Sequence, residues 1–161
     1  MVSICIENKP GFNIIGTKTW IPDTDNNLFG EFWKKCHTDG IIEQISKFNI
    51  KKEVSVTKSA VIGFSCTEKD PNMRSFYFYI AVETKENENR LNYEVLNVKP
   101  YRWAIFSSEG NDINALMECE MYAWKEWLPN NGTYIHDNGP EMEVYFQENK
   151  KIEYWIPVRE K

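Results

Sequence analysis

Apolar and polar residues alternate along the first 18 positions of the chain, and the alternation breaks once, at Lys9-Pro10-Gly11. A period of two is typical of half-buried strands, and a Pro-Gly break is typical of a turn. The pattern therefore predicts two strand segments within residues 2–18. Two more strands are predicted at 59–66 and 75–83, on either side of a turn-rich segment at 68–72.

A helical spacing separates these two pairs of strands. Leu28, Phe32 and Cys36 recur every four residues, and Gly40 follows them. This spacing predicts an amphipathic helix over 26–37 that ends before the glycine. A shorter helical segment is expected after it.

The same order of patterns returns after a polar connector, TKENENR. Residues 93–110 alternate and break at Lys99-Pro100, which predicts a strand pair. An apolar stripe over 113–128 predicts a second long helix, with Asn111 or Asp112 as its N-cap. The chain then closes with two more strands.

Each half thus has the order β-α-β-β, with pseudo-repeats at about 2–83 and 93–158. We expect an α+β fold built from this duplicated unit. Strands with mixed polar and apolar sides favour an antiparallel sheet, with the two long helices on one face of it. A cleft would then lie between the helices, above the central strands.

The length of 161 residues and the 42% hydrophobic content are suited to one domain, 1–161, with a real core. Aromatic residues make up 14%, which favours a pocket beyond the needs of the core. The net charge of −5, without a basic stripe, argues against direct binding to nucleic acid. The sequence has no leader and no apolar run near the roughly 18 residues that would span a membrane, so a cytoplasmic location is expected.

The cysteines and histidines give no indication of a metal, a cofactor or a disulfide framework. The four cysteines are scattered singly, without a Cys-x-x-Cys pair, and the two histidines are far apart. Cys36 and His37 are adjacent on the predicted helix and should point apart, which disfavours a nucleophilic pair. No Ser/His/Asp triad or Walker loop is present, so no catalytic residue is assigned.

The strand near the C-terminus raises a question about one carboxylate. Alternation places Glu143 and Tyr145 on one side of the strand and Met142 and Val144 on the other. In the simpler interpretation the acidic side faces water. In the alternative, Tyr145, together with Trp155 of the next strand, surrounds Glu143 with aromatic surface.

Four stretches of the chain resemble motifs of the GyrI-like small-molecule-binding domains: NVKPYRWAIFSSEG, WKEWLPNNGTY, GPEMEVYF and IEYWIPV. Such domains also form the effector-binding modules of AraC-type and MerR-type multidrug regulators of transcription. The first half is more diverged but retains Leu28 through Trp33 and the FYFYIAV strand. In this way the resemblance covers essentially the whole chain.

The resemblance implies a stand-alone bacterial domain whose hydrophobic cleft senses or sequesters lipophilic, often cationic, compounds near an acidic residue. Glu143 matches the family's strand glutamate, and Tyr145 matches its partner tyrosine. Trp33 matches the aromatic residue of the first helix, and Tyr79 matches a tyrosine of the first half. If Glu143 faces the cleft, burial raises the pKa of its carboxyl group, and a lipophilic cation relieves the cost of its charge.

Pseudo-symmetry adds Tyr77 and Tyr79 as counterparts of Glu143 and Tyr145. The candidate ligand-binding residues are therefore Glu143, Tyr145, Tyr79, Tyr77, Trp33, Trp124 and Trp155. For Tyr77, Tyr79 and Trp124, core packing is the alternative role. Glu120, at the edge of the second helix's apolar stripe, is expected to face solvent, and the alternative is a second acidic group in the cleft.

Two other functions stay open at this point. Some GyrI-like proteins hydrolyse strained electrophilic compounds, and Glu143 with a tyrosine could supply a base and an acid. A gyrase-inhibitor-like role in protein interaction is the other. Since the chain starts directly with its first strand, we expect any control of transcription to need a separate DNA-binding or protein partner.

Overall fold

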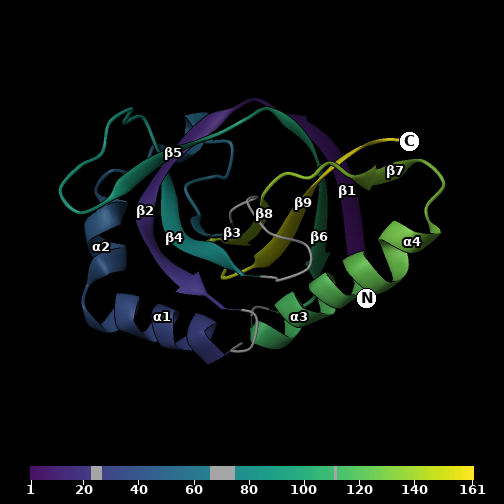
Figure 1. Cartoon of the computed structure of the whole chain (residues 1–161), viewed down its shortest axis with the longest axis horizontal. Coiled ribbons are helices and arrows are strands. Elements are labelled where there is room, and N and C mark those ends of the chain that lie inside the picture. Colours follow the sequence, from purple (N-terminus) through teal and green to yellow (C-terminus); the bar gives the residue numbers. More distant parts are fainter. Residues whose placement is uncertain (23–26, 66–74, 111) are drawn as a thin grey trace.

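The structure is a computed structural model that describes residues 1–22, 27–65, 75–110 and 112–161. It contains a nine-stranded sheet in which the paired strands are antiparallel, with helices packed on it (Figure 1). The predicted α+β fold is confirmed. The predicted turn at 68–72 and the alternative N-cap Asn111 lie outside the described residues.

The sheet has the strand order β1-β6-β9-β8-β3-β4-β2-β5, and β7 pairs with β9. Its strands are β1 (Val2–Lys9), β2 (Phe12–Ile21), β3 (Val61–Ser65), β4 (Phe76–Thr84), β5 (Glu94–Val98), β6 (Tyr101–Ser108), β7 (Tyr134–His136), β8 (Glu141–Tyr145) and β9 (Ile152–Glu160). The two halves of the chain meet where β3 pairs with β8. Outward from this line, β3-β4-β2 of the first half mirrors β8-β9-β6 of the second, as the duplicated unit requires.

The outermost strands are exchanged between the halves. β1 pairs with β6 of the second half, and β5 pairs with β2 of the first. The two strands expected within 93–110 are present as β5 and β6, but their pairing with each other was wrong, because β5 pairs with β2 and β6 pairs with β1 and β9. The two Lys-Pro breaks lie against each other at the crossing: a Cβ on Gly11 would come within 3.0 Å of the Val98 carbonyl oxygen and 3.2 Å of Pro100 Cδ. Glycine at position 11 allows this close approach.

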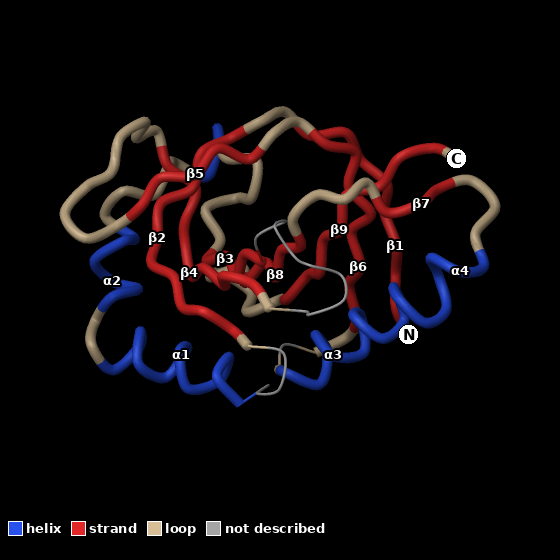
Figure 2. The backbone as a smooth tube through the Cα atoms, viewed as in Figure 1, coloured by secondary structure: helices blue, strands red, loops and turns tan. Residues whose placement is uncertain are grey.

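The helices cover one face of the sheet (Figure 2). The first half supplies α1 (Asn27–Thr38) and α2 (Ile41–Ser46) to this layer. The short 3₁₀ turn η1 (Lys52–Val54) lies apart from them (Figure 2), and the loop after it packs Val56 against the core of the other face. The second half supplies α3 (Ile113–Met121), which continues as a π-helical segment η2 (Tyr122–Trp127) and a last turn α4 (Leu128–Asn130). Asp112 is the N-cap of α3, because its carboxylate accepts a hydrogen bond of 3.1 Å from the Ala115 amide. None of the described helices combines the length and apolar character needed to cross a bilayer.

Alternation along the strands divides the core between the two faces of the sheet. On the helical face, Ile15 and Ile80 pack under α1 and α2, and Phe106 packs under α3. On the other face, Ile62, Trp103 and other alternate residues form a separate core. Because each strand contributes to both, the side of the sheet on which a residue lies decides whether it can reach the space between the helices.

Candidate ligand-binding site

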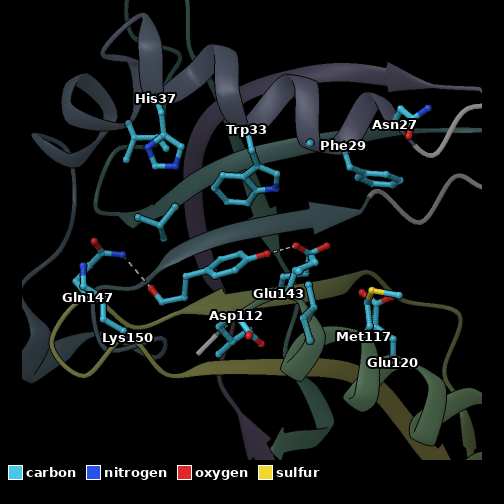
Figure 3. Close-up of a pocket in the computed structure, with 17 residues that line it drawn as sticks. Asn27, Phe29, Trp33, His37, Asp112, Met117, Glu120, Glu143, Gln147 and Lys150 are labelled. Carbon is cyan, nitrogen blue, oxygen red and sulfur yellow. Dashed lines mark hydrogen bonds between the residues drawn. The ribbon is translucent and has the colours of Figure 1, made fainter. Parts of the chain in front are cut away.

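A cavity of about 970 Å³ lies between α1 and α3 on the helical face of the sheet (Figure 3). Its floor is formed by β3, β8 and β9, with Val61 and Ile152 as apolar contributions. This is the position that the two-half arrangement predicts for a cleft. A volume of this size accommodates a drug-sized molecule.

Helix α1 provides an aromatic wall. Phe29, Trp33 and His37 recur every four residues on it and line the cavity, together with Asn27 and Gly30. Trp33 also packs edge-to-face on Tyr145 of the floor, with ring centroids 4.9 Å apart. The rings of the wall and of the floor thus meet inside the cavity.

Glu143 stands on the floor beside this aromatic contact. Its carboxylate accepts a hydrogen bond from the hydroxyl group of Tyr145, two residues along the same strand. Across the ladder its partner is Gly63 of β3, and a Cβ at that position would lie 3.1 Å from Glu143 Oε1 and 2.8 Å from Phe78 Cζ. Glycine at position 63 therefore leaves the space that the carboxylate occupies.

The charged form of Glu143 is disfavoured in the empty protein. Burial raises the pKa of this carboxyl group to about 8, and the negative charges of Glu120 and Glu141 add to the effect, while the Tyr145 hydrogen bond opposes it. Burial and the neighbouring Glu143 also raise the pKa of Tyr145, so its hydroxyl keeps the proton that it donates. The floor thus holds an acid that a positive ligand would help to ionise.

The α3 side of the cavity is apolar with an acidic edge. Ile113, Leu116 and Met117 supply aliphatic surface, and Glu120 lines the cavity one turn further on. The expectation that Glu120 faces solvent is therefore corrected: it is half-buried and belongs to the cavity lining. At the other end, in Figure 3, lie His37 and the exposed Lys150 of the β8–β9 turn.

Three of the seven predicted site residues line this cavity, namely Glu143, Tyr145 and Trp33. Trp124 does not. It lies in the π-helical segment, where its indole N–H donates a 2.8 Å hydrogen bond to the Tyr154 hydroxyl and its ring packs against His136. A regular α-helix would continue the stripe of Met117 and Glu120 to position 124, but the wider π turn changes the direction in which the later residues project.

The placement of Tyr77, Tyr79 and Trp155 in the cleft was wrong, because all three lie on the opposite face of the sheet. The Tyr79 hydroxyl donates to Glu94 at 2.9 Å, and Tyr77 packs edge-to-face on Trp20. The β-strand counterpart of β8 is β3, not β4, so the pseudo-symmetric assignment of the two tyrosines referred to the wrong strand.

Trp155 is excluded by the register of the last hairpin. Its cross-strand partner is Met142, whereas Glu143 is paired with Tyr154. Trp155 therefore lies in the core of the other face, near Trp103, at a centroid distance of 5.7 Å. A shift of one residue in this register would have brought it to the cavity.

Sequence reasoning missed several residues of the lining. Phe29 and Gly30 lie next to the stripe used to predict the first helix, and Met117 belongs to the stripe of the second. The signal was available in both cases, since residues one turn from Trp33 and Glu120 share their helix faces. Gly63, which leaves space for Glu143 beneath the lining, had no such signal, because its role appears only in its pairing with Glu143.

Comparison with known proteins supports an effector-binding fold. Residues 5–158 match the family model of Cass2, described as integron-associated effector binding protein. The chain belongs to this family. The resemblance to GyrI-like effector-binding domains is thereby confirmed. Among curated proteins, no match to the chain is found.

Solved structures share the fold over nearly the whole chain at low sequence identity. SAV2435 bound to tetraphenylphosphonium has a TM-score of 0.79 at 16% identity, with 98% of this chain and 94% of that chain covered. A protein from Staphylococcus aureus MU50, described as a bacterial transcription regulation protein, has a TM-score of 0.75 at 17% identity, with 98% of both chains covered. The integron cassette protein VCH_CASS2 of Vibrio cholerae has a TM-score of 0.69 at 17% identity, with 97% and 95% covered.

Proposed function

We propose that this Cass2 domain binds lipophilic cations in the cavity between α1 and α3, with Glu143 as the charge partner. The observation that carries the proposal is the position of Glu143, a carboxyl group on an aromatic floor with a pKa of about 8. Such a group costs free energy when it is charged and alone. A cation offsets this cost and leaves its apolar body against Phe29 and Trp33.

The surrounding rings add to the selection of positive charge. Trp33 and Tyr145 meet edge-to-face at the cavity, next to the Glu143 carboxylate. A cation placed over the face of such a ring gains about 0.5–2 kcal/mol. Because the remaining lining is largely aliphatic and aromatic, selectivity for ligand shape would be low, and ligands of different shape but similar charge would bind.

The relatives support the same ligand class. The Cass2 family is one of effector-binding proteins, and SAV2435, which shares the fold, has been solved with tetraphenylphosphonium. For this chain we propose sensing or sequestration of such a compound in the bacterial cytoplasm. Multidrug recognition, and a separate AraC-type or MerR-type DNA-binding or protein partner, remain predictions from the resemblance.

Titration calorimetry with tetraphenylphosphonium tests the proposal. Glu143→Gln keeps the size and hydrogen-bonding capacity of the side chain but removes its charge. We expect affinity for the cation to fall by about 1.5–3 kcal/mol, the scale of a charge-assisted hydrogen bond. Affinity for triphenylphosphine oxide, a neutral aryl compound, should change much less.

Glu153→Gln is the matched control. It removes the same charge from β9, but Glu153 lies on the other face of the sheet and accepts a hydrogen bond from Trp155. Cation affinity should be nearly unchanged in this variant. The proposal is wrong if the wild-type protein binds no lipophilic cation, or if Glu143→Gln weakens the cation and the neutral compound equally.

A further inference from the structure

Gly30 is a glycine in the cavity wall for which the fold itself offers no reason. It lies on α1 three residues before Trp33 and seven before His37, on the stripe that lines the cavity. Glycine in a helix lowers the stability of the fold relative to alanine, because the glycine backbone loses more conformational entropy on folding. A residue with this cost calls for a structural or a functional explanation.

The usual structural explanations do not apply at this position. Gly30 does not have a left-handed backbone, unlike Gly40 and Gly110, whose φ angles are 69° and 104°. It is not needed for close packing against the described residues either, because a Cβ added to it would meet none of their atoms within 4 Å. Gly11 and Gly63, by contrast, have backbone or side-chain atoms within 3.1 Å of the added Cβ.

The open space at Gly30 belongs to the cavity. Phe29 and Trp33 line the cavity from the same helix, and Ile113 and Met117 line it from α3. Both of these α3 side chains are largely exposed, at 62% and 50%. Gly30 is itself exposed, so among the described residues the α1 side of the cavity has an open space at this position.

We infer that Gly30 is a specificity-determining residue: the gap that it leaves in α1 receives one aryl group of the ligand. This inference rests on the proposed binding of lipophilic cations and adds a size limit to it. An aryl ring suits this position, because the same cavity is lined by the Trp33 ring and the Met117 side chain, and aryl groups pack well on such surfaces. A side chain at position 30 would compete with the ligand for this space.

The test replaces Gly30 with alanine and with leucine and measures two cations by titration calorimetry. Tetraphenylphosphonium carries four aryl groups, and methyltriphenylphosphonium carries three. We expect Gly30→Ala to weaken the binding of tetraphenylphosphonium by about tenfold, equivalent to about 1.4 kcal/mol. The binding of the smaller cation should weaken by less. Gly30→Leu should extend the loss to both.

Thermal stability of the empty protein provides the second measurement. Alanine is a better helix former than glycine, so the melting temperature of Gly30→Ala should rise by about 2–4 °C. Higher stability together with weaker binding is the signature of a position kept open for a ligand. A defect in folding would lower both.

Gly132→Ala is the matched control, because a Cβ there also meets nothing within 4 Å and Gly132 does not line the cavity. It should leave both affinities unchanged. If wild-type protein binds the phosphonium cations and Gly30→Leu binds both as tightly, the inference about Gly30 is overturned while the proposed function stands. If wild-type protein binds neither cation, the proposed function itself fails.

Discussion

At the residue scale, Glu143 combines a structural cost with the binding role that we propose for it. Its side chain is placed by strand alternation on the helical face, given space by Gly63, and held by the Tyr145 hydroxyl. Together, the strand alternation, the space at Gly63 and the Tyr145 hydrogen bond fix the direction of the carboxyl group. None of them supplies a positive charge, and in the proposed function a bound cation would supply it.

The raised pKa of Glu143 gives the free energy of unfolding a defined pH dependence. Between the ordinary value of 4.5 and the folded value of about 8, the folded protein holds a proton that the unfolded chain releases. The contribution to stability is therefore present at low pH and is lost as pH rises through this window. Denaturant unfolding from pH 5 to pH 9 should show a decline on the order of a few kcal/mol that Glu143→Gln lacks.

Cation affinity should change in the opposite direction over the same window. A permanent cation pairs with the ionised carboxylate, so binding to the protonated protein releases a proton. Affinity for tetraphenylphosphonium should rise by up to about tenfold per pH unit below pH 8 and then level off. Glu120, Glu141 and Tyr145 are the ionisable neighbours that act on this equilibrium. A flat profile in wild-type protein would show that Glu143 is already ionised when the cavity is empty.

At the residue scale, the sequence could predict the charged centre of the site but not its full outline. Glu143 and Tyr145 share a face by alternation, and this rule holds for any regular strand. The placement of Trp155 was wrong because its face depends on the register between β8 and β9, which the polar residues 147–151 of the turn leave undetermined. The predicted place of Trp124 in the cavity was wrong because a π-helical segment interrupts the α-helical period.

At the scale of elements, a buried carboxylate fixes the loop that follows η1 to the end of β4. Glu83 is 2% exposed. It accepts hydrogen bonds from the Ser55 hydroxyl, the Val56 amide, and the amide and hydroxyl of Thr57, at 2.7 to 3.0 Å. The loop brings Val56 against the core on the face of the sheet opposite the helices. This single residue thus ties an irregular segment to the sheet.

Glu83→Gln should destabilise the fold by about 2–4 kcal/mol in chemical denaturation. The amide side chain has one acceptor oxygen and adds a donor facing the loop's own donors, so buried polar groups lose their partners. Glu86→Gln is the control, since Glu86 makes a surface ion pair with Arg90 at 2.9 Å that is worth at most about 1 kcal/mol. Equal stabilities of the two variants would show that the Glu83 contacts contribute little.

At the scale of the whole molecule, the sequence pattern showed two similar halves but not how they are joined. Helical and strand periods identify elements and the faces they bury, and these were correct for the two long helices and the central strands. The alternation of apolar and polar residues along a strand is the same whichever strand is its neighbour in the sheet. The pairing of β1 with β6 and of β2 with β5 therefore has no signature in the pattern.

The exchange of the outer strands predicts that neither half folds well alone. In the first half, β1 would lack its partner β6, with which it pairs along all eight residues from Val2 to Lys9. In the second half, β5 would lack β2. Each separate half would also expose the edge where β3 and β8 pair, which is a site of aggregation.

Co-expression of residues 1–87 and 88–161 as two chains tests this arrangement. The break falls in the exposed connector, after the Glu86 carbonyl that accepts a hydrogen bond from Asn13 and before the Asn89 side chain that accepts one from Val95. We expect a 1:1 complex that unfolds cooperatively and binds tetraphenylphosphonium, because the exchanged strands hold the fragments together. A first fragment shortened to 10–87 is the control, and without β1 it should associate more weakly. Cooperative unfolding of either fragment alone as a monomer would contradict the prediction, since it would mean that a half does not depend on the strand supplied by the other.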